Sequence, residues 1–430
     1  MEKFDVIVVG AGPAGATAGM LLARAGMNVV IIERGQAPGG KNVSGGLIYT
    51  KPVVDVYPNF WETAPVERAI TSHQVVMLGD EGSAGLDFRS NAGGQPPYNA
   101  FSVLRAKFDP WLAQQAEEAG AALITGVTVD ALKMEGGRVV GIQAGPDELY
   151  ADVVVIAEGT RSLLLKQAGL RQEYHPHDVS LGIKEVIALP ERTLQDRFQC
   201  TETTGAAYTL VGQTKGIEGG GFIYTNKASL SLGVVVKIDS LYDSKLQPHQ
   251  VLDKFKAHPT VARMVEGGEV VEYSAQTVHR GGFHLPIQWY GDGYVVIGSA
   301  ARFLLNNVVT LRGMDLAIVS AEAAAKAIIS ASKKGSYLAA DLAEYLTLLQ
   351  QTAAYQDWKT FKDAYPLLEN HRLFEQYPNL AVNVLEHLFS PTAAPGKKAL
   401  GALRQEMAAE EISMMMLLKD MLQISRGMVL

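Results

Sequence analysis

The chain has 430 residues, a formal net charge of −7, and apolar and charged contents in the ordinary globular range. The length predicts two or three domains, and the negative charge argues against nucleic-acid binding, which usually needs a basic surface. The only cysteine, Cys200, excludes an intrachain disulfide framework and is interpreted as a structural residue. It also excludes an iron–sulfur cluster on this chain, since a cluster needs about four thiolates.

Neither end of the chain carries a recognisable targeting or membrane-spanning pattern. Met1 to Asp5 lead into the apolar run 6–9 with no basic segment before it, unlike a signal peptide. No window of about 18 uncharged apolar residues is present, which is the length that would span a bilayer. We therefore expect a cytoplasmic protein that is soluble or at most peripheral to a membrane.

The first 33 residues predict a βαβ unit. Residues 4–9 are typical of a buried parallel strand, 14–25 of a helix closed by Gly26, and 28–32 of a second buried strand that ends at Glu33. A unit of this kind takes about 30 residues.

The following residues alternate between sheet and helix patterns. They predict antiparallel strands within 73–104, a helix at 109–119, a strand at 122–125, a hairpin at 127–144 and a buried strand at 152–157.

The region 175–290 predicts a second, mostly antiparallel sheet. Its expected strands are 180–187, 207–211, 221–225 and 230–238, interrupted by one helix at 248–257. The chain then returns to a buried strand at 294–298 and a long helix from Gly313 to about Lys333, and it is helical in pattern from 338 onward. Four prolines, at 366, 378, 391 and 395, indicate helix boundaries there.

These patterns predict a discontinuous dinucleotide-binding domain. Residues 1–174 form its first part and 291–337 its second; 175–290 form an inserted sheet domain for a substrate or quinone, and 338–430 form a helical C-terminal region. The fold class is thus α/β (α+β), with a Rossmann-like domain and an inserted antiparallel sheet.

The loop Gly10-Ala11-Gly12-Pro13-Ala14-Gly15 matches the G-x-G-x-x-G pattern between a strand and a helix. In this context the first glycine permits the tight turn, the second lets the backbone approach a pyrophosphate, and the third lets helix and strand pack closely. The helix N-terminus offers free N–H groups to the phosphates. Glu33, about 20 residues on, is expected to accept hydrogen bonds from the ribose and to repel a 2′-phosphate.

Two further strand ends favour FAD over NAD. Residues 152–157 lead into Glu158-Gly159, and residues 294–297 lead into Gly298-Ser299. Ligands of open α/β sheets lie beyond the carboxyl ends of the strands. Three such glycine-bearing turns can hold a molecule with an ADP half and a second long half, which describes FAD.

The chain resembles FAD-dependent oxidoreductases of the geranylgeranyl-reductase and aromatic-hydroxylase type. It resembles most closely the FixC-type subunit of electron-transfer-flavoprotein:quinone oxidoreductases, over essentially its whole length. The strings that carry this resemblance are Lys41-Asn42-Val43-Ser44-Gly45-Gly46, Gly182-Ile183-Lys184-Glu185-Val186, Gly219-Gly220-Gly221-Phe222-Ile223-Tyr224-Thr225-Asn226-Lys227 and Leu311-Arg312-Gly313-Met314-Asp315-Leu316-Ala317.

The resemblance implies one FAD, no nicotinamide site and electron transfer from a heterodimeric electron-transfer flavoprotein to a membrane quinone. It also implies a separate ferredoxin-like iron–sulfur protein, because this chain has one cysteine. Related assemblies bifurcate electrons, with the bifurcating flavin in the partner. Because the implied electron acceptor is a membrane quinone, we expect a chain that is peripheral on the inner face of the cell membrane.

Motif and resemblance together predict the cofactor contacts. Arg34 and Lys41 are expected near the ADP half, Arg105 near the ribityl and phosphate region, Val129 at the adenine, and Gly313 and Met314 at the flavin N1/O2 edge. The full set is Gly10, Gly12, Pro13, Ala14, Gly15, Glu33, Arg34, Lys41, Gly45, Gly46, Arg105, Val129, Glu158, Gly159, Gly298, Ser299, Gly313 and Met314. No catalytic acid, base or nucleophile is predicted, because the cofactor carries the redox step.

Three positions depart from the family pattern. The family carries an aspartate before the glycine of the second strand-end turn, where this chain has Glu158. In the third strand-end turn, Ser299 replaces an aspartate and Arg302 replaces a glycine. Ser299 lacks the charge that strengthens a hydrogen bond to the ribityl chain, which predicts a loss of roughly 1 kcal/mol in affinity. Arg302 either adds a phosphate contact or narrows the site.

Other polar residues allow both functional and structural interpretations. His279, Arg280, His284 and Trp289 lie near the quinone or flavin, or pack in the core or at the surface. His175 and His177 resemble a metal pair without a third ligand, and Lys184 with Glu185 form a structural or functional pair. The apolar tail 412–430, with Lys419 and Arg426, has three interpretations: a helix at the membrane interface, a contact with a partner protein, or a terminal helix packed on the core.

Two alternative functions remain open from the residues. One is an FAD-dependent prenyl reductase or aromatic hydroxylase on the same fold, because fold alone does not select the reaction. The other is a scaffold subunit with weak or no flavin, which Ser299 and Arg302 keep in consideration.

Overall fold

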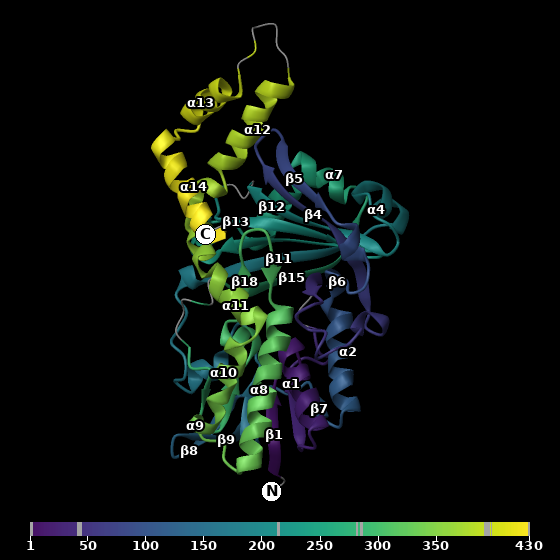
Figure 1. Cartoon of the computed structure of the whole chain (residues 1–430), viewed down its shortest axis with the longest axis vertical. Helices are drawn as coiled ribbons and strands as arrows, with labels where there is room; N and C mark the ends of the chain where they lie inside the picture. Colours follow the sequence, from purple (N-terminus) through teal and green to yellow (C-terminus); the bar gives the residue numbers. More distant parts are fainter. Residues whose placement is uncertain are drawn as a thin grey trace.

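The computed structural model describes residues 3–40, 45–212, 216–280, 283, 287–390, 396 and 398–428. Two large sheets lie one beyond the other along the long axis of the molecule, and a helical C-terminal region runs beside both (Figure 1). The N-terminus lies at the end opposite to helices α12 (Gln376–Phe389) and α13 (Ala399–Ala409).

The first sheet has a parallel centre, as the βαβ pattern predicts. Its parallel strands follow the order β17 (Tyr294–Val296), β10 (Asp147–Ile156), β1 (Lys3–Val9), β2 (Val29–Glu33) and β7 (Ala122–Thr125). Strands β8 (Ala131–Glu135), β9 (Arg138–Ala144) and β16 (Tyr290–Gly291) add antiparallel pairs. Val6 and Val154 are fully buried at the centre. Helix α1 (Pro13–Arg24) packs on β1, β2 and β10, α2 (Arg105–Glu118) contacts β7, and α2 and α8 (Met314–Lys334) pack against α1.

The second sheet has nine strands and one parallel pair, β12 with β4. Its path is β15 (Glu269–His279), β11 (Val179–Ala188), β14 (Ser229–Lys237), β13 (Gly219–Thr225), β12 (Thr204–Gly212), β4 (Val66–Leu78), β6 (Ala100–Leu104) and β3 (Gly45–Tyr49), with β5 (Ser83–Arg89) on β4. Four helices bury one of its faces: α4 (Glu191–Phe198), α5 (Ile238–Ser244), α6 (Pro248–Ala257) and α7 (Pro259–Val265).

Several helix and strand boundaries differ from the sequence expectation. The expectation of one helix within 175–290 is wrong, because α4, α5 and α7 accompany α6. These three have only seven or eight residues, too few for a clear helical period. The helix expected at 109–119 begins at Arg105, and the hairpin expected from residue 127 begins at Ala131.

The segment 45–104 contributes β3 to β6 to the second sheet rather than to the dinucleotide sheet. Its alternating pattern indicates strands, but the choice of sheet depends on pairing with β12, more than 100 residues later. Local sequence carries no signal for such a partner.

The C-terminal region is helical, as expected. It contains α9 (Ala339–Leu342), α10 (Glu344–Gln350), α11 (Ala353–Thr360), the 3-10 helices η6 (Phe361–Glu369) and η7 (His371–Leu373), α12, α13 and α14 (Met414–Met428). Pro366 lies inside η6 and Pro378 in the first turn of α12, so neither ends a helix.

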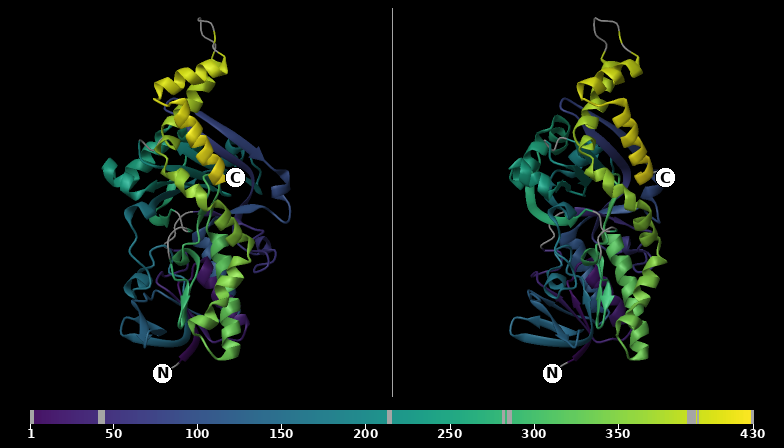
Figure 2. Two further views of the ribbon diagram at one scale, coloured as in Figure 1. Left: turned by 60° about the vertical axis from the view of Figure 1, so that its left-hand side comes forward. Right: turned by 90° about the vertical axis from the view of Figure 1, so that its left-hand side faces the viewer.

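Helix α14 returns along the molecule and packs against η6 (Figure 2). The buried carboxylate of Asp420 anchors it, accepting from Arg372 Nε at 2.7 Å and from the Tyr377 hydroxyl. No helix among the described residues is long and apolar enough to cross a membrane.

Candidate functional site

The turn between β1 and α1 has the geometry of a pyrophosphate-binding loop. Gly10 has a φ of +103°, which favours glycine. A Cβ on Gly15 would lie 1.8 Å from the Gly10 carbonyl oxygen, so only glycine fits there. Gly12 is the N-cap of α1 and no side chain caps this helix. Pro13 has no N–H and the Ala16 N–H donates to the Gly12 carbonyl, so the N–H groups of Ala14 and Gly15 are free for phosphate oxygens.

Glu33 is held beside this turn by the backbone. Its Oε2 accepts from the Ala11 N–H at 2.9 Å and its Oε1 from the Gly35 N–H at 2.7 Å. The Val127 N–H donates to the Glu33 carbonyl at 3.1 Å, which brings half-buried Val129 alongside. Arg34 is exposed, and Lys41 lies outside the described residues.

Arg105, the first residue of α2, brings a guanidinium to the glycine turn. One of its terminal nitrogens lies 3.8 Å from where a Cβ on Gly12 would stand. Its Nε and Nη2 each donate to the fully buried carboxylate of Asp109 at 2.5 Å. Burial raises the pKa of Asp109, and the positive charge of Arg105 opposes this effect. Arg105 is therefore fixed in place and available to a phosphate or ribityl oxygen.

The second strand-end turn uses its acid to cap a helix. The carboxylate of Glu158 accepts from the Leu164 N–H at 3.1 Å and the Leu165 N–H at 3.3 Å, at the start of α3 (Leu163–Gln167). Burial raises the pKa of Glu158. Gly159 has a φ of +78° with open space around it. The longer side chain thus reaches the helix, and contact of either residue with the cofactor stays a prediction.

The third turn lies against the glycine loop. A Cβ on Gly298 would lie 2.8 Å from the Cβ of Ala14, and the Gly298 N–H donates to Ser320 Oγ at 2.9 Å. The Ser299 carbonyl contacts His279 Nε2 at 3.0 Å. All three strand-end turns therefore converge at one edge of the first sheet.

Arg302 follows this turn with a φ of +66°, a conformation that suits the glycine of the family pattern. Its guanidinium is buried and lies 5.1 Å from the ring centroid of Tyr174. Burial lowers the pKa of Arg302, and its Nε and Nη1 have no hydrogen-bond partner within the described part of the chain.

Helix α8 begins at the junction of the two sheets. Gly313 is its N-cap, and no side chain caps it. A Cβ on Gly46 would lie 3.1 Å from Met314 Cε, and one on Gly45 would lie 2.1 Å from Ser231 Oγ. Strand β3 therefore lies close to both α8 and β14, and contact of Gly45, Gly46 and Met314 with the flavin stays a prediction.

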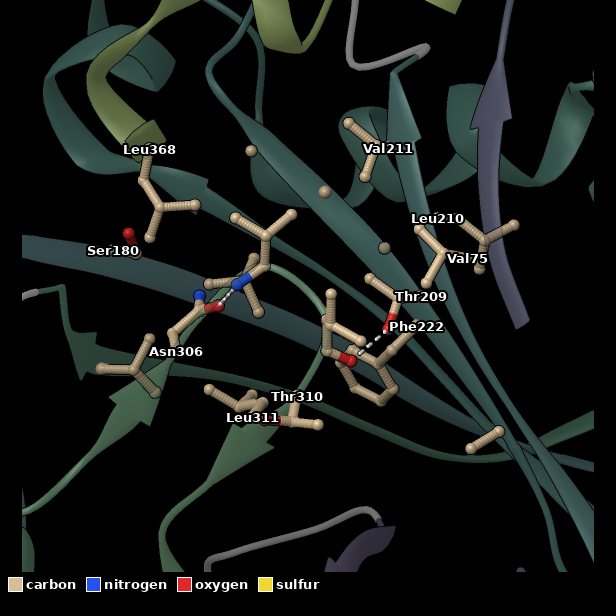
Figure 3. Close-up of a pocket in the computed structure, with 18 of the residues that line it drawn as sticks. Val75, Ser180, Thr209, Leu210, Val211, Phe222, Asn306, Thr310, Leu311 and Leu368 are labelled. Atoms are coloured by element: carbon tan, nitrogen blue, oxygen red, sulfur yellow. Dashed lines mark hydrogen bonds between the residues drawn. The ribbon is translucent and has the colours of Figure 1, made fainter. Parts of the chain in front are cut away.

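A cavity of about 140 Å³ lies between the second sheet and a short hairpin, β18 (Leu305–Asn306) with β19 (Leu311–Arg312) (Figure 3). Two hydrogen bonds position the hairpin loop: Thr209 Oγ1 donates to the Val309 carbonyl at 3.3 Å, and Asn306 Oδ1 accepts from the Val308 N–H at 3.0 Å (Figure 3). The walls are mainly apolar and include Val75, Leu210, Val211, Phe222, Leu311 and Leu368.

Tyr49 and Tyr224 line the same cavity. The Arg312 guanidinium lies 5.6 Å from the Tyr49 ring centroid. Burial, and to a smaller extent the nearby Asp315, raises the pKa of Tyr49 to about 12. Leu311 in the cavity wall and Arg312 beside Tyr49 lead directly into the N-terminus of α8. Sequence reasoning missed both tyrosines, although Tyr224 belongs to a string that carries the resemblance.

Of the four residues His279, Arg280, His284 and Trp289, the first two line the cavity. Arg280 is held by the Leu368 carbonyl at 2.8 Å and the Glu369 carboxylate at 2.7 Å. Burial lowers the pKa of His279 to about 4. Trp289 instead packs in an aromatic cluster, 5.4 Å from Phe303 between ring centroids, and His284 lies outside the described residues.

Lys184 and Glu185 are not a pair, because they face opposite sides of β11. Glu185 binds Lys256 of α6 at 2.9 Å, whereas the Lys184 ammonium lies 5.9 Å from the ring centroid of Phe222. Burial lowers the pKa of Lys184 to about 8.

The rings of His175 and His177 stack at 5.4 Å. No group of three or more His, Cys, Asp or Glu within the described ranges is arranged to hold a metal.

Two uncapped helix N-termini, three glycine turns and a fixed Glu33 fit FAD, and they define an FAD-dependent oxidoreductase. The family model for FAD-dependent oxidoreductases matches residues 5–174. A second model, for the ubiquinone-binding region of ETF-QO, matches residues 179–278.

The chain belongs to the FixC family of electron-transfer-flavoprotein–quinone-oxidoreductase-like proteins. It is 41% identical over 420 residues to the probable electron transfer flavoprotein-quinone oxidoreductase YdiS of Escherichia coli K12, covering 97% of each chain. It is 42% identical over 390 residues to protein FixC of the same strain, covering 90% of this chain and 91% of that one.

Solved structures share the fold at low identity. A geranylgeranyl bacteriochlorophyll reductase-like protein from Thermoplasma acidophilum superposes with a TM-score of 0.72 at 19% identity, covering 99% of this chain and 100% of that one. The flavin-dependent brominase Bmp2 gives a TM-score of 0.64 at 20% identity, covering 90% and 99%.

Proposed function

We propose that this protein passes electrons from an electron-transfer flavoprotein to a quinone whose head group occupies the cavity beside the second sheet. The names of the relatives and the match of residues 179–278 to a ubiquinone-binding model support this proposal. The cavity walls are mainly apolar, which suits a flat hydrophobic ring with few polar groups.

The cavity wall continues directly into the start of α8, where the flavin is expected, and this observation carries the proposal. Leu311 lines the cavity, Arg312 lies beside the Tyr49 ring, and Gly313 is the uncapped N-cap of α8. The wall residue Leu311 therefore lies only two positions before Gly313, the helix end expected at the flavin. Such proximity favours direct electron transfer between the two rings.

The FAD would be held by the glycine turn, Glu33 and Arg105 at its ADP half, and by the turns at Gly298 and Gly313 at its flavin half. Bound FAD supplies the two-electron carrier. The chain would orient it, with the N-terminal end of α8, uncapped by any side chain, available to the flavin edge where negative charge develops on reduction.

The proposed partners come from the likeness to the FixC family. With one cysteine, Cys200, it holds no iron–sulfur cluster, so a separate ferredoxin-like chain would accompany it beside the heterodimeric electron-transfer flavoprotein. Electron bifurcation, where it occurs, would use the flavin of the partner.

Peripheral contact with the inner face of the cell membrane is part of the proposal. Leu385, Leu388 and Phe389 are exposed on α12. Helix α14 has an exposed apolar face that includes Met414, Met415, Leu418, Met421 and Leu422. Lys419 and Arg426 are exposed next to it. Helix α14 packs on η6, whose Leu368 lines the cavity, so the apolar face lies near the route that a quinone tail would take.

The test uses the purified full-length protein. A yellow preparation with one FAD per chain, reduced under anaerobic conditions, should be reoxidised by a short-chain ubiquinone or menaquinone analogue. Oxidation by NADP⁺, or NADPH turnover with a prenyl lipid or a phenol, would favour the reductase or hydroxylase alternative. A colourless protein that resists FAD reconstitution would defeat the proposal. Copurification from the native host tests the electron-transfer flavoprotein and the ferredoxin-like chain.

A further inference from the structure

Two tyrosines from distant parts of the chain line the proposed quinone cavity. Tyr49 ends β3 and Tyr224 lies near the end of β13, and these two strands contact each other. Tyr224 is 9% exposed, and its ring stacks on Phe222, whose position in the cavity is shown in Figure 3, at 4.9 Å between centroids.

Within the described part of the chain, neither hydroxyl has a hydrogen-bond partner, although both residues are largely buried. Two buried tyrosines away from the cavity are satisfied: Tyr345 donates to the Val296 carbonyl at 3.1 Å, and Tyr57 pairs with Thr17 at 3.0 Å. Both residues line the cavity, and neither hydroxyl belongs to the buried atoms without a partner, so both hydroxyls are accessible there. Two free donors at a single apolar cavity fit a ligand that brings an acceptor.

Both hydroxyls are suited to donate rather than accept. Burial raises the pKa of Tyr49 to about 12, and burial together with nearby Tyr49 raises the pKa of Tyr224. They therefore keep their protons throughout the physiological range. A quinone carbonyl oxygen has two lone pairs and no proton, and it complements such a pair of donors.

We propose that Tyr49 and Tyr224 donate hydrogen bonds to one carbonyl oxygen of the bound quinone and so fix the orientation of its ring. This inference rests on the proposed function. The two donors face the oxygen on which negative charge develops as the ring is reduced, and they stabilise that charge without giving up their protons. The two protons of the quinol product come from solvent and from the reduced cofactor.

The experiment compares Tyr49→Phe, Tyr224→Phe and the double variant with the wild type, all as purified holoproteins. Two acceptors are used: a short-chain ubiquinone analogue, and ferricyanide, which needs no hydrogen bond to a carbonyl. Each single variant should lower kcat/KM for the quinone by about tenfold and the double variant by more, with ferricyanide reduction unchanged. Tyr337→Phe, a buried tyrosine at the far end of α8, is the matched control and should leave both rates unchanged.

FAD content and thermal midpoint, measured on every variant, show whether it is folded. Direct titration of the oxidised holoprotein with the quinone analogue, followed by protein fluorescence, should show weaker binding in the folded phenylalanine variants. Wild-type-like binding and kinetics in the double variant would overturn the inference. Loss of quinone and ferricyanide activity in parallel would also overturn it, because that pattern indicates damage at the flavin. A wild type that reduces no quinone defeats the proposed function itself, which separates the two failures.

Discussion

The imidazole Nε2 of His279 lies 3.0 Å from the carbonyl oxygen of Ser299. This contact joins the last residue of β15 in the second sheet to the turn after β17 in the first. Because a carbonyl oxygen only accepts, Nε2 must carry the proton, and Nδ1 is left as an unpaired acceptor. The wall of the cavity and the third cofactor turn are therefore mechanically linked.

This contact predicts a pH dependence of stability. The pKa of His279 is lowered to about 4 by burial, whereas an unfolded histidine titrates at about 6.5. Between these values the unfolded state binds more protons, so the free energy of unfolding should fall as the pH drops from 6.5 to 4, by about 1 kcal/mol per pH unit. His73 has a lowered pKa as well and contributes in the same direction.

Chemical denaturation at a series of pH values measures this slope. His279→Gln, whose amide can still donate to Ser299, should flatten it, and His249→Gln, at an exposed position on α6, should not. An unchanged slope in His279→Gln would show that the imidazole is not neutral in the folded protein.

The glycine loop offers a pair of substitutions with different expected effects. Gly15→Ala places a Cβ 1.8 Å from a backbone oxygen and should lower the stability of the FAD-free protein by more than about 2 kcal/mol. Gly12→Ala meets only Arg105, at 3.8 Å, in an extended conformation that alanine adopts readily. It should therefore leave the FAD-free protein folded and weaken FAD binding by at least about tenfold, because its methyl group occupies the pyrophosphate approach. Thermal melting and FAD titration of both variants separate packing from binding; normal FAD affinity in Gly12→Ala would argue against a pyrophosphate at this turn.

Arg105 and Asp109 allow a double-mutant cycle. Arg105→Met leaves a buried carboxylate without its partner and should cost about 3 kcal/mol of stability. Adding Asp109→Leu should recover much of that loss, since both charges are then absent. FAD affinity should stay low in both variants, because the guanidinium near the turn is missing. If the double variant binds FAD like the wild type, the role of Arg105 is structural alone.

The C-terminal apolar face predicts membrane binding that surface charges abolish. Met415 is 81% exposed and Leu422 is 61% exposed, so Met415→Glu with Leu422→Glu should leave the thermal midpoint unchanged. Flotation with phosphatidylglycerol-containing vesicles should show binding lowered about fivefold or more. Tyr242→Glu alters an equally exposed side chain on α5 and serves as the control. Equal flotation of all three proteins would contradict the membrane contact.

The cofactor class could be predicted from the sequence, because the signals for it are local. A strand, a glycine turn, a helix and Glu33 all fall within about 30 residues, and the steric reason for Gly15 acts over five residues. The position of the carboxyl ends of β10 and β17 then follows from the rules of parallel sheets.

The cavity could not be predicted in this way, because long-range pairing creates it. Tyr49 reaches Tyr224 only when β3 lies across β13, and Leu368 joins them only when η6 folds back onto the sheet. The alternation of a strand already places Lys184 and Glu185 on opposite faces, but only the tertiary structure decides that α6 covers the face of Glu185. Register and layer order come from burial summed over the whole chain, and no short segment encodes that sum.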